Sequence, residues 1–244
     1  MSEAKDPRDV TDGEDIETLG QALRVFFSRP GPRLIAKNAA VAWGVRAFLG
    51  PPVLSELAIC AGVVAWWPFQ EWLAHKYLLH LEPREIFGKK LDPLFSQKHR
   101  KHHVNPRDID LTLLPMEVVR GAMPGNIAAW LLLAGVRRQA VTGIAAYATM
   151  ALAYEWTHFI VHTGYKPKSE YAKKVRKNHR LHHYRNENYW LGFVAPLVDR
   201  VFGTDPDPRK VPASKTVRDL FGLEAREAGA REAEAGDADA TQAS

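Results

Sequence analysis

The sequence predicts an all-α protein: an integral membrane helical bundle of about four transmembrane helices, paired as two hairpins, with a cytoplasmic histidine-rich helical cap. Four long apolar stretches favour the bundle, at residues 34–49, 53–74, 113–136 and 139–162. Each approaches the roughly 20 residues that a helix needs to cross about 30 Å of hydrocarbon. The ten histidines favour the cap, because all of them fall in four short clusters within or beside these stretches.

Length and composition favour one domain. The 244 residues suffice for one substantial core, which we place at residues 18–223. Residues 1–17 and 224–244 are polar and poor in large apolar side chains, so we expect disordered tails and no cleavable secretory signal. Lysine and arginine exceed aspartate and glutamate by five. The single cysteine, Cys60, allows neither a disulfide framework nor a thiolate metal site.

The first predicted helix covers residues 18–28 and ends before Pro30. We interpret it as an interfacial helix. Its apolar side chains share roughly one face at helical spacing: Leu19, Leu23, Phe26 and Phe27.

Two turns divide the four apolar stretches into two predicted hairpins. Residues 50–52 (Gly-Pro-Pro) separate the first pair, and residues 135–138 separate the second. Charges intrude, and a charge held at mid-bilayer costs about 2.5 to 3.5 kcal/mol. We expect these charges at segment ends or facing inward, and whether residues 34–49 fully span stays open. A soluble all-helical protein is the alternative, consistent with a mean hydropathy of −0.27. The intruding charges are Lys37, Arg46, Glu117 and Arg120.

Basic residues predict the sidedness. Residues 84–107 and 164–185 are rich in lysine and arginine, whereas Arg137 and Arg138 mark the opposite turn. An even number of crossings separates the two basic segments, so both would emerge on one face, and the positive-inside rule makes that face cytoplasmic. We therefore expect a multi-pass membrane protein whose basic segments hold the cap at the anionic lipid surface.

The histidines have regular spacing. They read H-x4-H, H-x2-H-H, H-x3-H and H-x2-H-H along the chain, with none left over. A lone histidine is usually a hydrogen-bonded core residue, and basic histidine-rich tracts can be unstructured metal scavengers. Two identical triplets and the absence of strays favour a built metal site instead. The candidate ligands are His75, His80, His99, His102, His103, His158, His162, His179, His182 and His183.

Helix geometry indicates how these rings converge. At about 100° per residue, His158 and His162 lie about 40° apart, and each triplet falls within about 100°, so each of these clusters is expected to aim at one point. His75 and His80 lie about 140° apart on a regular helix, which predicts a helix end, a π-bulge or service to two different ions. Ten imidazoles exceed what one ion coordinates. We expect two ions with four or five rings each.

Four polar neighbours are candidates for orienting the imidazoles through hydrogen bonds. Glu71 lies one turn before His75, and Glu155 lies three residues before His158. Either glutamate could equally be an ordinary helix charge. Asp108 and Asn178 are weaker candidates for the same role.

Three segments carry a resemblance to a known family. "WPFQEWLAHKYLLH" at 67–80, "KHRKHHVNPRD" at 98–108 and "NYWLGFVAPLVDRVFGT" at 188–204, together with the histidine spacings, resemble the fatty acid hydroxylase and sterol desaturase superfamily over about residues 60–205. The order of spacings is most similar to that of the fatty acid 2-hydroxylases, in which ten such histidines hold a dimetal centre.

The resemblance implies that all ten histidines bind two iron ions, and that zinc can replace iron in purified protein. It implies an O2-dependent hydroxylase acting on a C–H bond of a fatty acyl lipid. With no histidine left for haem, electrons would come from a separate reductase, ferredoxin or small haem cytochrome, and no nucleic acid is involved. A sterol or isoprenoid desaturase or methyl oxidase is the alternative within the superfamily. A non-catalytic membrane protein with structural zinc is a further alternative, disfavoured because ten ligands exceed two four-coordinate sites.

Overall fold

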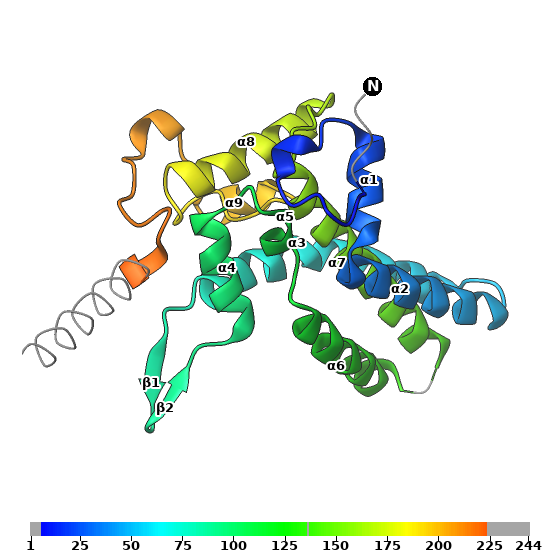
Figure 1. Cartoon of the computed structure of the whole chain (residues 1–244). Coiled ribbons are helices and arrows are strands. Elements are labelled where there is room, and N and C mark those ends of the chain that lie inside the picture. The colour runs from blue at the N-terminus through cyan, green and yellow to red at the C-terminus, as the bar shows by residue number, and fades with distance from the viewer. Residues whose placement is uncertain (1–5, 136, 224–244) are drawn as a thin grey trace, which may run out of the picture.

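A computed structural model describes residues 6–135 and 137–223, and most of this part of the chain is helical (Figure 1). One long helix, α7 (Arg138–Val161), lies at the centre of the bundle. Packed against it are α2 (Pro30–Phe48), α3 (Leu54–Ala74) and α6 (Met116–Ala134), and α1 (Leu19–Ser28) contacts both α2 and α7.

The remaining elements gather at one end of this bundle, around α8 and α4 (Figure 1). They supply short helices and turns rather than a second layer. In chain order they are the 3₁₀ turn η1 (Gly13–Asp15), the π-helical turn η2 (His75–Leu79), strands β1 (Arg84–Ile86) and β2 (Lys89–Leu91), α4 (Leu94–Val104), α5 (Ile109–Thr112), α8 (Glu170–Tyr184), α9 (Leu197–Val201), η3 (Pro208–Lys210) and η4 (Leu220–Gly222).

Local sequence explains where the helices begin and end. A capping box starts α1, since the Thr18 hydroxyl accepts from the Gln21 amide at 3.2 Å and the Gln21 side chain accepts from the Thr18 amide at 2.9 Å. Pro30 occupies the first turn of α2, where its missing N–H is not needed. Gly135 ends α6 with a φ of 65°, a conformation that glycine adopts without steric cost.

The four predicted long helices are present, but the prediction that they cross a membrane is wrong. Within residues 6–135 and 137–223, no helix combines the length and the apolar character that a membrane crossing requires. Each has sufficient residues, yet polar side chains interrupt the apolar surface; Arg46 of α2, for example, is buried against Glu56 of α3 and Thr142 of α7. Because the positive-inside argument presupposes crossings, the cytoplasmic position of the histidines stays a prediction.

Two further details of the predicted fold are also wrong. The described chain is not purely α-helical, because β1 and β2 pair as an antiparallel hairpin through Phe87 and Gly88, both of which have positive φ. The first predicted hairpin is also absent as a packing unit, since α2 and α3 each pack mainly on α7 rather than on each other. The second, α6 with α7, forms as expected.

The N-terminal segment is ordered where it is described. Ile16 is only 1% exposed and joins the main apolar cluster. The Gly13 amide donates to the Arg107 carbonyl at 2.8 Å, and the Gly13 carbonyl accepts from the Gly164 amide at 2.9 Å. The disorder expected for residues 1–17 is therefore wrong for 6–17, because this segment gains backbone partners from α4–α5 and from the end of α7. Residues 1–5 and 224–244 lie outside the described residues.

We expect α1 to stabilise the fold through its buried face, which differs from the predicted interfacial face. Phe26 is 1% exposed and packs on Trp156 and Phe159 at ring-centroid distances of 5.2 and 5.3 Å, whereas Phe27 is 40% exposed. Phe26→Ala should lower the free energy of unfolding by about 3–5 kcal/mol. Phe27→Ala, the control, should change it by less than about 1 kcal/mol. Denaturant titration measures both, and equal losses would contradict this packing.

Candidate metal centre

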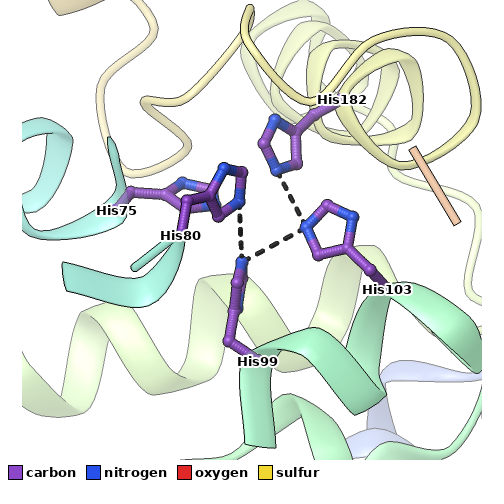
Figure 2. A group of neighbouring side chains, drawn as sticks. All are labelled: His75, His80, His99, His103 and His182. Carbon is purple, nitrogen blue, oxygen red and sulfur yellow. Dashed lines mark hydrogen bonds between the residues drawn. The ribbon is translucent and has the colours of Figure 1, made fainter. Parts of the chain in front are cut away.

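The ten histidines form two adjacent groups of five. In each group, one nitrogen from every ring lies within 4.8 Å of the other four. All the rings are buried except those of His80 and His162, which are half-buried. Group A consists of His75, His80, His99, His103 and His182, which point toward one another in Figure 2. Group B consists of His102, His158, His162, His179 and His183.

The two triplets are divided between the groups, so the expectation that each aims at one point is wrong. On α4, His99 and His103 enter group A, while His102 enters group B. The reason is helical: residues four apart differ by about 40°, whereas His102 lies about 100° from His103.

The α8 triplet is divided in the opposite sense. Its i, i+4 pair, His179 and His183, joins group B, and His182 joins group A. Each of these two helices therefore contributes to both groups and holds them together. The ring centroids of His103 and His183, which belong to different groups, are 4.3 Å apart.

A π-helical turn brings the H-x4-H pair together. The His80 amide donates to the His75 carbonyl at 3.2 Å, which is the i→i+5 bond of a π-helix. The two ring centroids are 5.0 Å apart and both rings enter group A. The predicted π-bulge is confirmed, and the pair does not serve two different groups.

Backbone carbonyls fix the tautomers of four rings. A carbonyl only accepts, so a ring Nδ1 at hydrogen-bond distance from one must carry the proton, and the Nε2 of that neutral ring is then a bare lone pair. The four bonds run from His75 to Leu191 O (2.7 Å), His103 to Val217 O (2.9 Å), His158 to Thr112 O (2.7 Å) and His182 to Tyr189 O (2.9 Å).

This assignment leaves electron pairs facing one another. The Nε2 atoms of His103 and His182 lie 3.2 Å apart, and neither carries a proton, so their contact, dashed in Figure 2, is not a hydrogen bond. The Nε2 atoms of His75 and His158 are buried without any hydrogen-bond partner among the described residues. Buried lone pairs turned toward a common point require a cation between them.

A proton does not satisfy that requirement. Burial lowers the pKa of His158 to about 4 and that of His103 to about 3. Burial likewise holds the pKa of each of the other eight rings well below its ordinary value. Neutral imidazoles at neutral pH are the form that metal ions bind.

The nitrogen spacing fits first-row metal ions. Two nitrogens bound about 2.1 Å from one ion and at right angles lie about 3.0 Å apart. In group A the Nε2 of His99 lies 3.1 Å from that of His80 and 3.2 Å from that of His103. The close Nε2 pairs of group B are 2.7 to 3.1 Å apart. Imidazole suits zinc, copper, iron and nickel alike, so the ligands alone do not select the metal.

Glu71 supports the site through the backbone, not through an imidazole as predicted. Its Oε1 accepts from the amides of Phe193 and Val194 at 2.6 and 3.0 Å. The same loop presents the Leu191 carbonyl to His75, which follows Glu71 by one turn. Burial raises the pKa of Glu71 to about 8, so the carboxyl is largely neutral at pH 7.

Glu155 repeats this arrangement in group B. Its Oε2 accepts from the Leu114 amide at 3.0 Å, two residues after the Thr112 carbonyl that accepts from His158. Burial raises its pKa to about 7. Neither glutamate hydrogen-bonds an imidazole among the described residues, because backbone carbonyls already occupy the Nδ1 atoms of His75 and His158, the histidines nearest to them in sequence.

The two weaker candidates do not hydrogen-bond a histidine among the described residues. Asp108 caps α5 and accepts from the Asp110 amide at 3.0 Å. Asn178 is buried on α8, and its side-chain nitrogen has no hydrogen-bond partner in the described chain.

Sequence reasoning missed the support from Asp199. Its carboxylate accepts from the amides of Leu191 and Gly192 at 2.9 and 3.0 Å and from the Thr204 hydroxyl at 2.6 Å. Thr204 also accepts from the indole N–H of Trp72 at 2.9 Å. The sequence segment 188–204, already noted for its resemblance to the family, contains Asp199 and could have indicated this support. In the structure it forms a loop whose Tyr189 and Leu191 carbonyls accept from two histidines of group A.

Phe193 closes one side of both groups. Its ring stacks on His158 at 5.0 Å between centroids with an interplanar angle of 24°. It also contacts His75 of group A at 5.9 Å and His179 of group B at 5.2 Å. A fully buried phenyl ring at this position excludes water from the region between the groups.

The fold and the site together define a helical protein with two neighbouring five-imidazole sites, each suited to one metal ion. Comparison with known proteins places it more narrowly. The chain belongs to the fatty acid hydroxylase family, whose model matches residues 60–204 and so includes all ten histidines.

Similar proteins share part of their length with this chain. A dihydroceramide fatty acyl 2-hydroxylase of Arabidopsis thaliana is 28% identical over 151 residues, which cover 62% of this chain and 61% of that protein. A fatty acid 2-hydroxylase of Rattus norvegicus is 25% identical over 59% of this chain and 39% of its own length. The solved structure of full-length scs7p, in which only the hydroxylase domain is visible, shares the fold with a TM-score of 0.62 at 22% identity, covering 76% of this chain and 68% of that one.

Removing the Glu71 carboxyl should weaken metal binding. Glu71→Ala leaves two buried amides without an acceptor and releases the loop that orients His75, so affinity should fall about 10–100-fold. Glu71→Gln retains an acceptor oxygen and should lose roughly threefold or less. Zinc titration against a competing chelator measures both. The control is Gln70→Ala, whose side chain contacts Tyr147 instead. Equal affinity of Glu71→Ala and wild type would contradict this role.

Acid should destabilise the metal-free protein. The folded-state pKa of His158 is about 4, against an ordinary value of 6.5. Below pH 6.5 the unfolded chain therefore takes up protons that the folded chain does not. Each such proton lowers the free energy of unfolding by about 1.4 kcal/mol per pH unit. The raised pKa of Glu71 acts in the opposite direction between about pH 8 and 4.5, but histidines outnumber such glutamates. Denaturant unfolding should show stability falling from pH 6.5 towards 4. A flat profile would contradict it.

Proposed function

We propose that this chain is a di-iron oxygenase that hydroxylates a C–H bond of a fatty acyl lipid, using O2 and electrons from a separate donor. The convergence of ten neutral imidazoles into two adjacent groups, in a chain of the fatty acid hydroxylase family, carries the proposal. The similar proteins named above act, by their names, on fatty acyl groups. Since this chain spans only part of their length, its activity and substrate are proposals.

The reaction has a definite balance. R–H, O2, two electrons and two protons give R–OH and water. Iron, when bound, supplies the redox chemistry that activates O2, which zinc does not supply because it does not change oxidation state. Neither reductant nor protons come from the histidines, since an imidazole is not a reductant and burial keeps these rings neutral. The electrons must therefore arrive from another molecule.

The role of the chain's own residues is to hold the metal ions and to orient the imidazoles that bind them. The ten imidazoles would bind the two ions, five to each group, through nitrogens aimed by carbonyls such as those of Thr112 and Leu191. Phe193 excludes water between the groups, which protects a reactive site from side reactions.

We place the reacting carbon at a small pocket beside the histidines. Its lining includes His99 of group A, His158 of group B, apolar side chains such as those of Leu79 and Phe95, and the charged residues Lys98 and Glu155. Its volume of about 20 Å³ holds about one water-sized group. An acyl chain would therefore enter only by displacing side chains of this lining.

Mass spectrometry of lipids tests the function. Extracts of cells that express the wild-type chain with iron should contain fatty acyl lipids that have gained one oxygen. His103→Ala removes a group A ligand and should abolish the product, whereas Lys89→Ala, on the exposed β2 strand, should not. Loss of two hydrogens instead would indicate a desaturase. Iron-loaded protein that produces neither change with a competent reductant would contradict the proposal.

A further inference from the structure

A basic groove runs along the outer side of α8. It has a volume of about 690 Å³, and none of the ten histidines lines it, although most of its lining side chains come from α8. Pro167, Leu181 and Tyr184 form its apolar part. Five cations line the rest: Lys166, Lys173, Arg176, Lys177 and Arg180.

The positive charge of this groove is poorly compensated. No acidic residue is among its lining side chains. Lys173 pairs with Glu170 at 2.7 Å, but no ion pair within the described residues involves Lys166, Lys177 or Arg180. Burial and the neighbouring charge of Arg180 lower the pKa of Arg176, as expected where cations crowd together. The groove therefore attracts anionic partners.

The groove lies directly behind the histidines. Lys177 and Arg180 alternate along α8 with His179 and His182, and residues two apart differ by about 200° around a helix. One face of α8 is accordingly exposed and basic, while the other is buried in the metal centre. A molecule bound in the groove is separated from both groups by about one helix diameter, roughly 10 Å.

We propose that this α8 groove is the docking surface for an acidic electron-carrier protein that reduces the histidine-bound ions. The inference rests on the proposed function, because hydroxylation by O2 requires two electrons that the chain does not contain. Electron transfer weakens steeply with distance, so a donor must dock where few atoms intervene. A charged rim around an apolar centre also suits the small, transient interfaces of redox partners.

Position favours a protein over a lipid surface as the occupant. The most exposed apolar side chains of the bundle include Phe48 and Leu54, 92% and 82% exposed at the turn between α2 and α3, and Leu132, 87% exposed near the end of α6. These elements lie at the right and lower right of Figure 1, whereas α8 runs along the top. A lipid surface that covered this apolar end would not reach the α8 groove.

Charge reversal tests the docking surface. The double variant Lys177→Glu with Arg180→Glu should bind a purified acidic 2Fe–2S ferredoxin at least about tenfold more weakly than wild type by calorimetry. It should also oxidise the reduced ferredoxin correspondingly more slowly when loaded with iron, without any lipid present. The wild-type rate should fall steeply with added salt. A small acidic haem cytochrome serves as the second probe.

Matched controls separate docking from folding and from catalysis. Lys89→Glu with Lys90→Glu makes the same charge change on exposed β2 and should leave both measurements within about twofold. Metal content, and the rate of reduction by methyl viologen radical, should be unchanged in both double variants. Hydroxylation driven by methyl viologen tests the proposed function independently of the groove.

Three results would overturn the inference. The first is equal binding and oxidation of ferredoxin by wild type and the α8 double variant. The second is failure of the wild type to bind either carrier protein. The third is a double variant that loses binding only to vesicles of phosphatidylserine and phosphatidylcholine, which would make the groove a lipid contact.

Discussion

The candidate metal centre depends on one electrostatic constraint: ten neutral imidazoles, eight buried and two half-buried, converge in two small volumes, and at least four of them present bare lone pairs there. Lone pairs at about 3 Å repel unless a cation lies between them. Their convergence must therefore be held from outside by groups that leave each Nε2 unprotonated. A backbone carbonyl can only accept a hydrogen bond. When it accepts from Nδ1–H, the proton of the neutral ring is fixed on Nδ1 and Nε2 stays unprotonated.

The segments around the two histidine groups hold those carbonyls in place. They come from segments far apart in the chain, at Thr112, at Tyr189 and Leu191, and at Val217. Buried carboxyl groups fix two of these segments by accepting from their amides. Burial raises the pKa of Glu71 to about 8, that of Glu155 to about 7 and that of Asp199 to about 6. The site thus combines neutral ligands with supports whose negative charge burial disfavours.

The bundle shows how far apolar content alone predicts structure. Apolar stretches located the four long helices, because burial on several sides of a helix leaves a recognisable run. Their length suggested membrane crossings, but a crossing also needs a continuous apolar surface. Arg46 and Glu56 satisfy each other inside the described bundle, and that pairing between α2 and α3 is not visible in either stretch alone.

The sequence by itself determined the ten histidines, their helical spacing, the π-helical turn between His75 and His80, and the family. These follow from local geometry, which fixes the relative direction of side chains on one helix. Only the tertiary structure decided that each triplet is divided between two groups, that carbonyls and not Glu71 or Glu155 orient four of the rings, and that a basic groove backs the α8 histidines. Several of these relations join residues more than a hundred positions apart, such as His103 and Val217, and packing alone sets their distance.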